Sequence, residues 1–145
     1  MRAQIPDTSV LIQFIRDPDM WPSFQKALAS GRVWLSSVVV AELYAGTRSP
    51  GDAQFLDSIV GALSRVDRTL TPSASDWARA GRLMGRYSRL RGEFRTRDHL
   101  ADVLILISAA RLGGVVLTAN PRHFEAWADL ARRSGLTVLV ERSFA

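Results

Sequence analysis

The sequence predicts an α/β fold in which a parallel sheet of four or five short strands lies between two layers of helices. Short runs rich in Val, Ile and Leu alternate along the chain with longer segments of helical periodicity, the order typical of strand–helix–strand units. The strand-like runs are apolar throughout, as expected where helices cover both faces of a sheet. A chain of 145 residues is long enough to bury its own core, so we expect a single domain over residues 1–145.

Apolar spacing places the individual elements. Strands are expected just before Asp7, at 33–35, 115–118 and 136–140, with a weaker extended segment at 68–72. Helices are expected at 10–15, 24–28, 52–66, 73–90, 100–112 and 124–133, where apolar side chains recur every three or four residues. In the 73–90 helix, this spacing predicts one apolar face that carries Trp77, Ala80, Met84 and Tyr87.

The segment 36–46 carries conflicting signals. Its three consecutive valines favour a strand. A serine in front of the segment and Gly46 at its end are typical of a capped helix, and we expect a helix.

Composition limits the possible functions. The chain has no cysteine, which excludes disulfides, thiolate metal sites and thiol nucleophiles. It carries 19 Lys and Arg against 14 Asp and Glu, a net charge of +5, and such a surface should attract polyanions. No apolar run is long enough for a secretory signal or a membrane span, so we expect a cytoplasmic protein.

Three acidic residues interrupt apolar segments. Asp7 ends the first strand, Glu42 follows the valines of the 36–46 segment, and Asp102 lies near the start of the apolar 100–112 helix. Acids in such settings are rarely buried unless they are paired or bind a metal. For Asp7 the simpler alternative is a helix N-cap.

Bringing three carboxylates together requires a shared proton or a cation. Two of them about 4 Å apart repel by roughly 4 kcal/mol at an effective dielectric constant near 20. A set of oxygen ligands without cysteine favours a hard ion such as Mg²⁺ or Mn²⁺ over zinc. Such ions activate water and stabilise displaced oxygens in phosphodiester cleavage.

Four segments together resemble a known family. They are residues 7–12 (DTSVLI), 37–46 (SVVVAELYAG), 102–110 (DVLILISAA) and 117–124 (LTANPRHF). Their order, their spacing and the chain length resemble the PIN-domain nucleases, and among these the VapC-type toxins of bacterial toxin–antitoxin pairs. The resemblance covers essentially the whole chain.

The resemblance implies a PIN-like three-layer α/β/α fold and a metal-dependent endoribonuclease. Asp7, Glu42 and Asp102 would hold Mg²⁺ or Mn²⁺, and Ser9 and Thr118 would line the site. The substrate would be single-stranded segments of structured RNA. The implied partners are a small antitoxin that blocks the acidic pocket and a second copy of the chain, as a homodimer or within a hetero-oligomer.

The chain also departs from the family pattern. Family members often carry a further acid in the turn after the fourth strand, where this chain has Asn120 and His123. Asn120 could still offer a carbonyl oxygen, and Asp98 could compensate from one helical turn before Asp102. Pro6 removes a backbone donor, which suggests that the first strand ends just before Asp7.

The basic residues concentrate in one part of the chain. They are Arg79, Arg82, Arg86, Arg89, Arg91, Arg95 and Arg97. Arg82, Arg86 and Arg89 share one helical face, which is either a solvated surface or an RNA-binding surface that follows phosphates.

Two other functions remain open. One is a non-catalytic RNA- or protein-binding module on the same scaffold, which the missing turn carboxylate favours. The other is phosphatase chemistry of the haloacid-dehalogenase type, which needs a second aspartate two residues after the first. The chain has Ser9 at that position, which argues against it.

Overall fold

The computed structural model describes residues 2–142 and contains the alternating elements that the sequence predicts. The strands are β1 (Gln4–Pro6), β2 (Leu35–Ser36), β3 (Thr69–Leu70), β4 (Val115–Leu117) and β5 (Leu139–Glu141). The helices are α1 (Thr8–Arg16), α2 (Trp21–Ala29), α3 (Ser37–Ala45), α4 (Pro50–Arg65), α5 (Ala74–Arg91), α6 (Thr96–Leu112) and α7 (Arg122–Arg133), and a single 3₁₀ turn spans Pro18–Met20. No helix in this range is long and apolar enough to cross a membrane.

All strand pairs are parallel. β1, β4 and β5 form one ladder, and β2 pairs with β3 in a second. An isolated bridge between Gln4 and Val33 joins the ladders, with the Trp34 N–H donating to the Gln4 carbonyl at 2.9 Å. The strands therefore follow the order β3-β2-β1-β4-β5, with β1 in the centre, and the predicted α/β/α architecture is confirmed.

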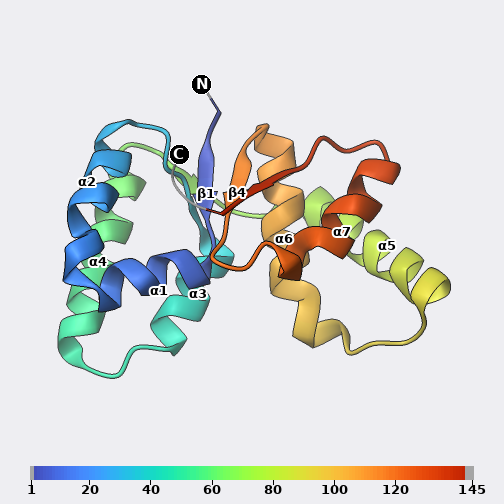
Figure 1. The fold of residues 1–145 in the computed structure, drawn as a ribbon, viewed down its shortest axis with the longest axis horizontal. Coiled ribbons are helices and arrows are strands. Elements are labelled where there is room, and N and C mark those ends of the chain that lie inside the picture. The colour runs from blue at the N-terminus through green and yellow to red at the C-terminus, as the bar shows by residue number, and fades with distance from the viewer. Residues whose placement is uncertain (1, 143–145) are drawn as a thin grey trace.

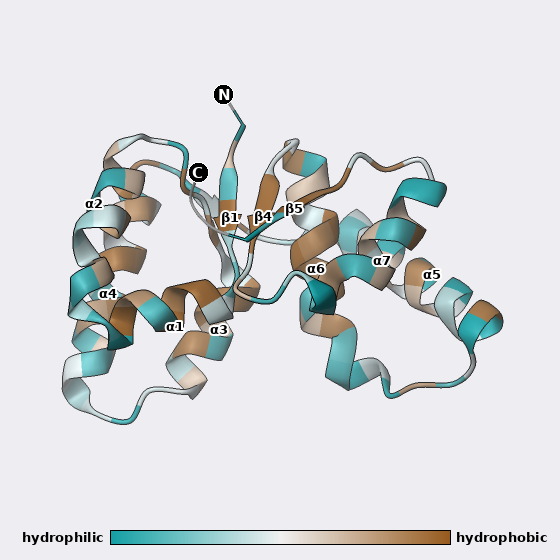
Figure 2. Cartoon of the chain, in the orientation of Figure 1, coloured by the Kyte–Doolittle hydropathy of each residue, from teal (hydrophilic) through white to brown (hydrophobic). Residues whose placement is uncertain are grey.

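The helices form two groups beside the strands. Figure 1 shows α1 to α4 on one side of β1 and β4, and α5, α6 and α7 on the other. The inner elements carry many of the apolar residues, since β4 and the middle of α6 are mainly brown in Figure 2. Ile5, Val116 and Leu106 have no exposed surface, so β1, β4 and α6 provide the centre of the core.

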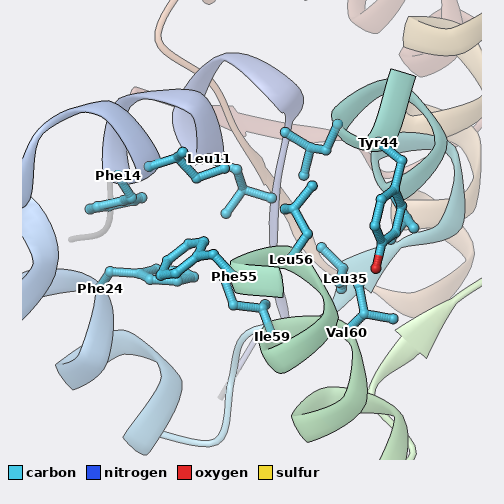
Figure 3. Close-up of a pocket in the computed structure, with 12 residues that line it drawn as sticks. Leu11, Phe14, Phe24, Leu35, Tyr44, Phe55, Leu56, Ile59 and Val60 are labelled. Atoms are coloured by element: carbon cyan, nitrogen blue, oxygen red, sulfur yellow. The ribbon is translucent and has the colours of Figure 1, made fainter. Parts of the chain in front are cut away.

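The first helical group is closely packed and dry. In Figure 3, aromatic and aliphatic side chains from α1, α2, α3 and α4 point toward one another. Phe14 and Phe24 stack at 4.7 Å between ring centroids, and Trp21 lies 4.9 Å from Phe55. The remaining void of about 10 Å³ is lined by apolar side chains and offers no partner to a water molecule.

The ambiguous segment is a helix, as expected. The Ser36 side chain caps α3 by accepting a hydrogen bond from the Val38 N–H at 3.2 Å, and Gly46 ends the helix. Val39 and Leu43, four residues apart, are buried on the same face. Capping and tertiary burial therefore outweigh the β propensity of the valines.

The prediction that Trp77 lies on a buried face of its helix is wrong. Ala80 and Met84 of α5 are buried, but the Trp77 residue is 50% exposed. The N-terminal turn of α5 is held instead by Asp76, which is fully buried and accepts a hydrogen bond from Arg111 of α6 at 2.9 Å. Burying Asp76 turns the neighbouring Trp77 outward, because successive helical residues point about 100° apart.

Candidate functional site

The candidate site lies where β1 and β4 end. Asp7 follows β1 directly, and Thr118 follows β4. The Asp7 N–H donates to the Leu117 carbonyl at 2.8 Å, which holds the two strand ends together. Parallel sheets place ligand sites at this edge, because several loops leave the carboxyl ends of their strands there.

Asp7 is both a helix cap and a candidate ligand. Its Oδ1 accepts hydrogen bonds from the Val10 N–H at 3.1 Å and from Ser9 Oγ at 2.6 Å. Only 7% of the residue is exposed. Both bonds use Oδ1, so Oδ2 takes no part in them. The capping alternative is therefore correct, and it is compatible with a second role.

A chain of hydroxyl groups supports Asp7 from the β4 side. The Ala119 N–H donates to Ser9 Oγ at 3.0 Å, and the Asn120 N–H donates to Thr118 Oγ1 at 3.1 Å. Ser9 Oγ and Thr118 Oγ1 are 3.4 Å apart. Since Ser9 gives its proton to Asp7, Thr118 is the donor in this contact. These bonds fix the orientation of the Asp7 carboxylate.

Glu42 reaches the site from α3. Its Oε1 accepts a hydrogen bond from Thr8 Oγ1 at 2.8 Å, which joins α3 to the first residue of α1. Unlike Asp7, Glu42 is exposed. The carboxylate is held at one oxygen only and remains open to solvent.

Asp102 contributes the third carboxylate, from α6. Burial, and after it the negative charges of Glu42 and Asp7, raise its pKa from 3.8 to about 6. His123 and His99 oppose this increase. The three acids thus lie close enough for the charges of the other two to act on Asp102, and no cation fully compensates them.

The three acids influence one another electrostatically but do not form a ready metal site. Among residues 2–142, no three Asp, Glu, His or Cys side chains form a group that could already hold a metal ion. Carboxylates that repel one another are expected to stay apart without a cation. The donors are hard oxygen atoms in a region of negative charge, so their chemistry fits Mg²⁺ or Mn²⁺.

The other residues that the sequence suggested are either exposed or line a separate groove. Asp98 is exposed in the first turn of α6 and is not among the groups whose charge shifts the pKa of Asp102. Asn120 is exposed beside Thr118. Arg82, Arg86 and Arg89 line a separate groove on α5, together with Ser134.

Sequence reasoning missed a second surface beside the acids. A groove of about 480 Å³ contains Glu42, Trp77, Arg97 and Leu100 in its lining. It lies between α3, the start of α5 and the start of α6. No sequence signal separates Trp77 from the buried residues of its helix, because its spacing from Ala80 and Met84 is that of a core residue.

Comparisons with known proteins support this architecture. The VapBC complex of Salmonella typhimurium bound to DNA contains a chain with a TM-score of 0.69 and 22% identity, and the match covers 98% of both chains. A chain of VapBC2 from Rickettsia felis, bound to a promoter DNA fragment, has a TM-score of 0.67 and 20% identity over 98% of this chain and 99% of that one. A chain of FitAcB from Neisseria gonorrhoeae has a TM-score of 0.62 and 20% identity, and the match covers 94% of this chain and 95% of that one.

These identities are low, so the structural matches establish the fold alone. No curated protein sequence matches the chain. The model of the PIN domain, in contrast, matches residues 5–130. This range contains Asp7, Glu42 and Asp102 and covers most of the sequence, and we conclude that the chain belongs to the PIN-domain family.

Proposed function

We propose that this protein is a metal-dependent endoribonuclease and acts as the toxin of a toxin–antitoxin pair. The observation that carries the proposal is the approach of Asp7, Glu42 and Asp102, from three different elements, at the carboxyl end of the sheet. An uncompensated group of oxygen donors favours a divalent cation and a phosphodiester substrate.

In this proposal the three carboxylates hold Mg²⁺ or Mn²⁺. When bound, the ion would activate water and stabilise negative charge on the phosphate and the leaving oxygen. Ser9 and Thr118 keep the Asp7 carboxylate in place through their hydroxyl chain. Asn120 is exposed two residues after Thr118 and would orient water or substrate. Asp98 would have a supporting role at the start of α6.

RNA is the proposed substrate, cleaved in single-stranded segments. The net charge of +5 favours a polyanion, and Arg82, Arg86 and Arg89 are proposed to contact phosphates. The chains with the same fold were solved within VapBC and FitAcB complexes. We therefore propose a small antitoxin as partner, and a homodimer or a hetero-oligomer with that antitoxin as the assembly.

RNA cleavage by the antitoxin-free protein tests this function. We expect cleavage with Mg²⁺ or Mn²⁺, none with EDTA, and at least a hundredfold slower cleavage by Asp102→Asn. Asp19→Asn, which removes an exposed acid of the 3₁₀ turn that is not among the charges shifting the pKa of Asp102, is the charge-matched control and should cleave normally.

The same assay distinguishes the proposal from a binding module. A non-catalytic module would bind RNA without cleaving it, with or without metal. Cleavage that persists undiminished in EDTA or in Asp102→Asn would refute the metal-dependent mechanism.

A further inference from the structure

A groove lined by four arginines runs along α5. It has a volume of about 930 Å³ and lies between α5 and the segment that follows α7. Arg79, Arg82, Arg86 and Arg89 all line it. The described lining does not include Asp7, Glu42 or Asp102, and Figure 1 shows α5 extending away from β1, α1 and α3 toward the edge of the molecule.

The four arginines form a row. They are separated by three, four and three residues, so they lie on one face of the helix and extend about 15 Å along its axis. Arg86 donates a hydrogen bond to Ser134 Oγ at 2.7 Å, which fixes one guanidinium group against the opposite wall. Arg79, Arg82 and Arg89 are exposed.

This row has no acidic counterpart. The described lining of the groove includes no Asp or Glu. Within residues 2–142 the ion pairs are Arg111–Asp76 and Arg133–Asp129, so the four guanidinium groups are not paired with carboxylates. Like charges one turn apart destabilise a helix slightly, and a bound polyanion would remove that cost.

Two glycines of α5, Gly81 and Gly85, line the groove between the arginines. At Gly85 the Arg89 Nη1 atom lies 3.5 Å from where a Cβ atom would be. A Cβ atom at Gly81 would meet nothing within 4 Å, so packing does not require a glycine there, although glycine is about 1 kcal/mol less favourable than alanine in a helix. The missing side chain leaves room for a chain of phosphates to approach the helix.

We propose that this arginine groove binds the sugar–phosphate backbone of a folded part of the RNA, away from the strand that is cut. This inference rests on the proposed function and specifies its substrate as an RNA large enough to reach both sites. Guanidinium forks match phosphate oxygens and carry no sequence preference. A row of charges along a helix suits the repeating charge of a nucleic acid better than the scattered carboxylates of a protein.

The test is RNA binding measured in EDTA, where it does not depend on cleavage. The probes are a fluorescently labelled RNA hairpin with a long stem and a short unstructured oligonucleotide. The test variant is Arg82→Gln combined with Arg89→Gln, two exposed positions. The matched control is Lys26→Gln combined with Arg65→Gln, which removes the same charge from α2 and α4.

We expect the test variant to bind the hairpin at least fivefold more weakly. The slope of log affinity against log salt should become less negative by about 1.5, since each lost phosphate contact contributes about 0.7–0.9. Binding of the short oligonucleotide, and binding by the control variant, should change less than twofold.

Equal hairpin binding by both variants would overturn the inference. So would a test variant that binds the hairpin normally but loses affinity for polyglutamate, because the groove would then recognise an acidic protein. A protein that binds the hairpin through this groove but cleaves no RNA in Mn²⁺ would refute the proposed function and leave the groove assignment standing.

Discussion

Two regions of the molecule bury an aspartate at a helix N-terminus, and they treat its charge in opposite ways. Asp76 is the third residue of α5, forms a capping box with Ser73, and is paired with Arg111 at 2.9 Å. Asp7 caps α1 with hydroxyl and amide donors, and its neighbours in the pocket are two further acids. The first arrangement neutralises a charge, and the second accumulates charge.

The two aspartates differ in how their negative charge is compensated. A buried carboxylate that serves stability needs an opposite charge or enough donors to compensate its desolvation. Asp76 has both. At the candidate site His123 and His99 only partly offset the negative charge around Asp102, so its acids are an electrostatic cost that a divalent ion would relieve.

The largest effect is expected from Asp7→Asn. Asparagine caps helices about as well as aspartate, so the free energy of unfolding should stay within about 0.5 kcal/mol. The loss of a ligand charge should lower kcat/KM for RNA by at least about a hundredfold. Cleavage kinetics and thermal unfolding of the same preparation check both expectations, and unaltered cleavage would remove Asp7 from the proposed mechanism.

Asp76→Ala should show the opposite pattern. It removes a cap and the buried half of an ion pair, while Arg111, with 41% of its side chain exposed, can regain water. We expect destabilisation by about 2–3 kcal/mol in urea unfolding, and cleavage that is normal per folded molecule. Asp129→Ala, which breaks an exposed pair with Arg133, is the control and should cost less than about 1 kcal/mol.

Asp102→Asn should stabilise the metal-free protein. The pKa of Asp102 is raised from its ordinary value of 3.8 to about 6, so ionisation opposes folding and stability is lost as pH rises through this window. Allowing for partial solvent screening, the variant should be more stable by about 1–2 kcal/mol at pH 8.

The pH dependence is the diagnostic part of this prediction. The difference between Asp102→Asn and the parent should vanish near pH 4, grow between pH 4 and pH 6, and level off above that range. Urea unfolding in EDTA across this range measures it, and a difference that does not depend on pH would contradict the charge argument.

Ser9→Ala should have the smallest effect. It removes the 2.6 Å bond to Asp7 and leaves the Ala119 N–H without its acceptor. We expect cleavage about three- to tenfold slower, equivalent to about 1 kcal/mol, with the metal still bound. Ser9→Thr, which keeps the hydroxyl, should recover part of the activity. Full activity of Ser9→Ala would show that the hydroxyl chain does not position Asp7.

Much of the fold could be predicted from local signals. The apolar runs locate β1, β2, β4 and β5, and β3 falls within the weaker extended segment at 68–72. The serine and glycine caps identify α3 as a helix despite its valines. Pro6 does end β1, as expected from its missing donor, and Asp7 follows at once.

The electrostatic roles could not be predicted in the same way. Asp76 lies in a polar stretch of sequence, and its partner Arg111 is 35 residues away, so no local pattern marks it as buried. Trp77 shares the spacing of core residues but is displaced outward by its neighbour. The pairing of Asp76 with Arg111 and the exposure of Trp77 depend on how α5 packs against α6. The spacing of apolar residues in the sequence does not predict that packing.

Calorimetric titration with Mn²⁺ tests the central claim most directly. The account predicts that the parent protein binds Mn²⁺, that Asp7→Asn and Asp102→Asn each weaken binding by at least about tenfold, and that Asp76→Asn leaves it unchanged. Equal Mn²⁺ affinity in the parent, Asp7→Asn and Asp102→Asn, or no uptake by the folded parent, would contradict it.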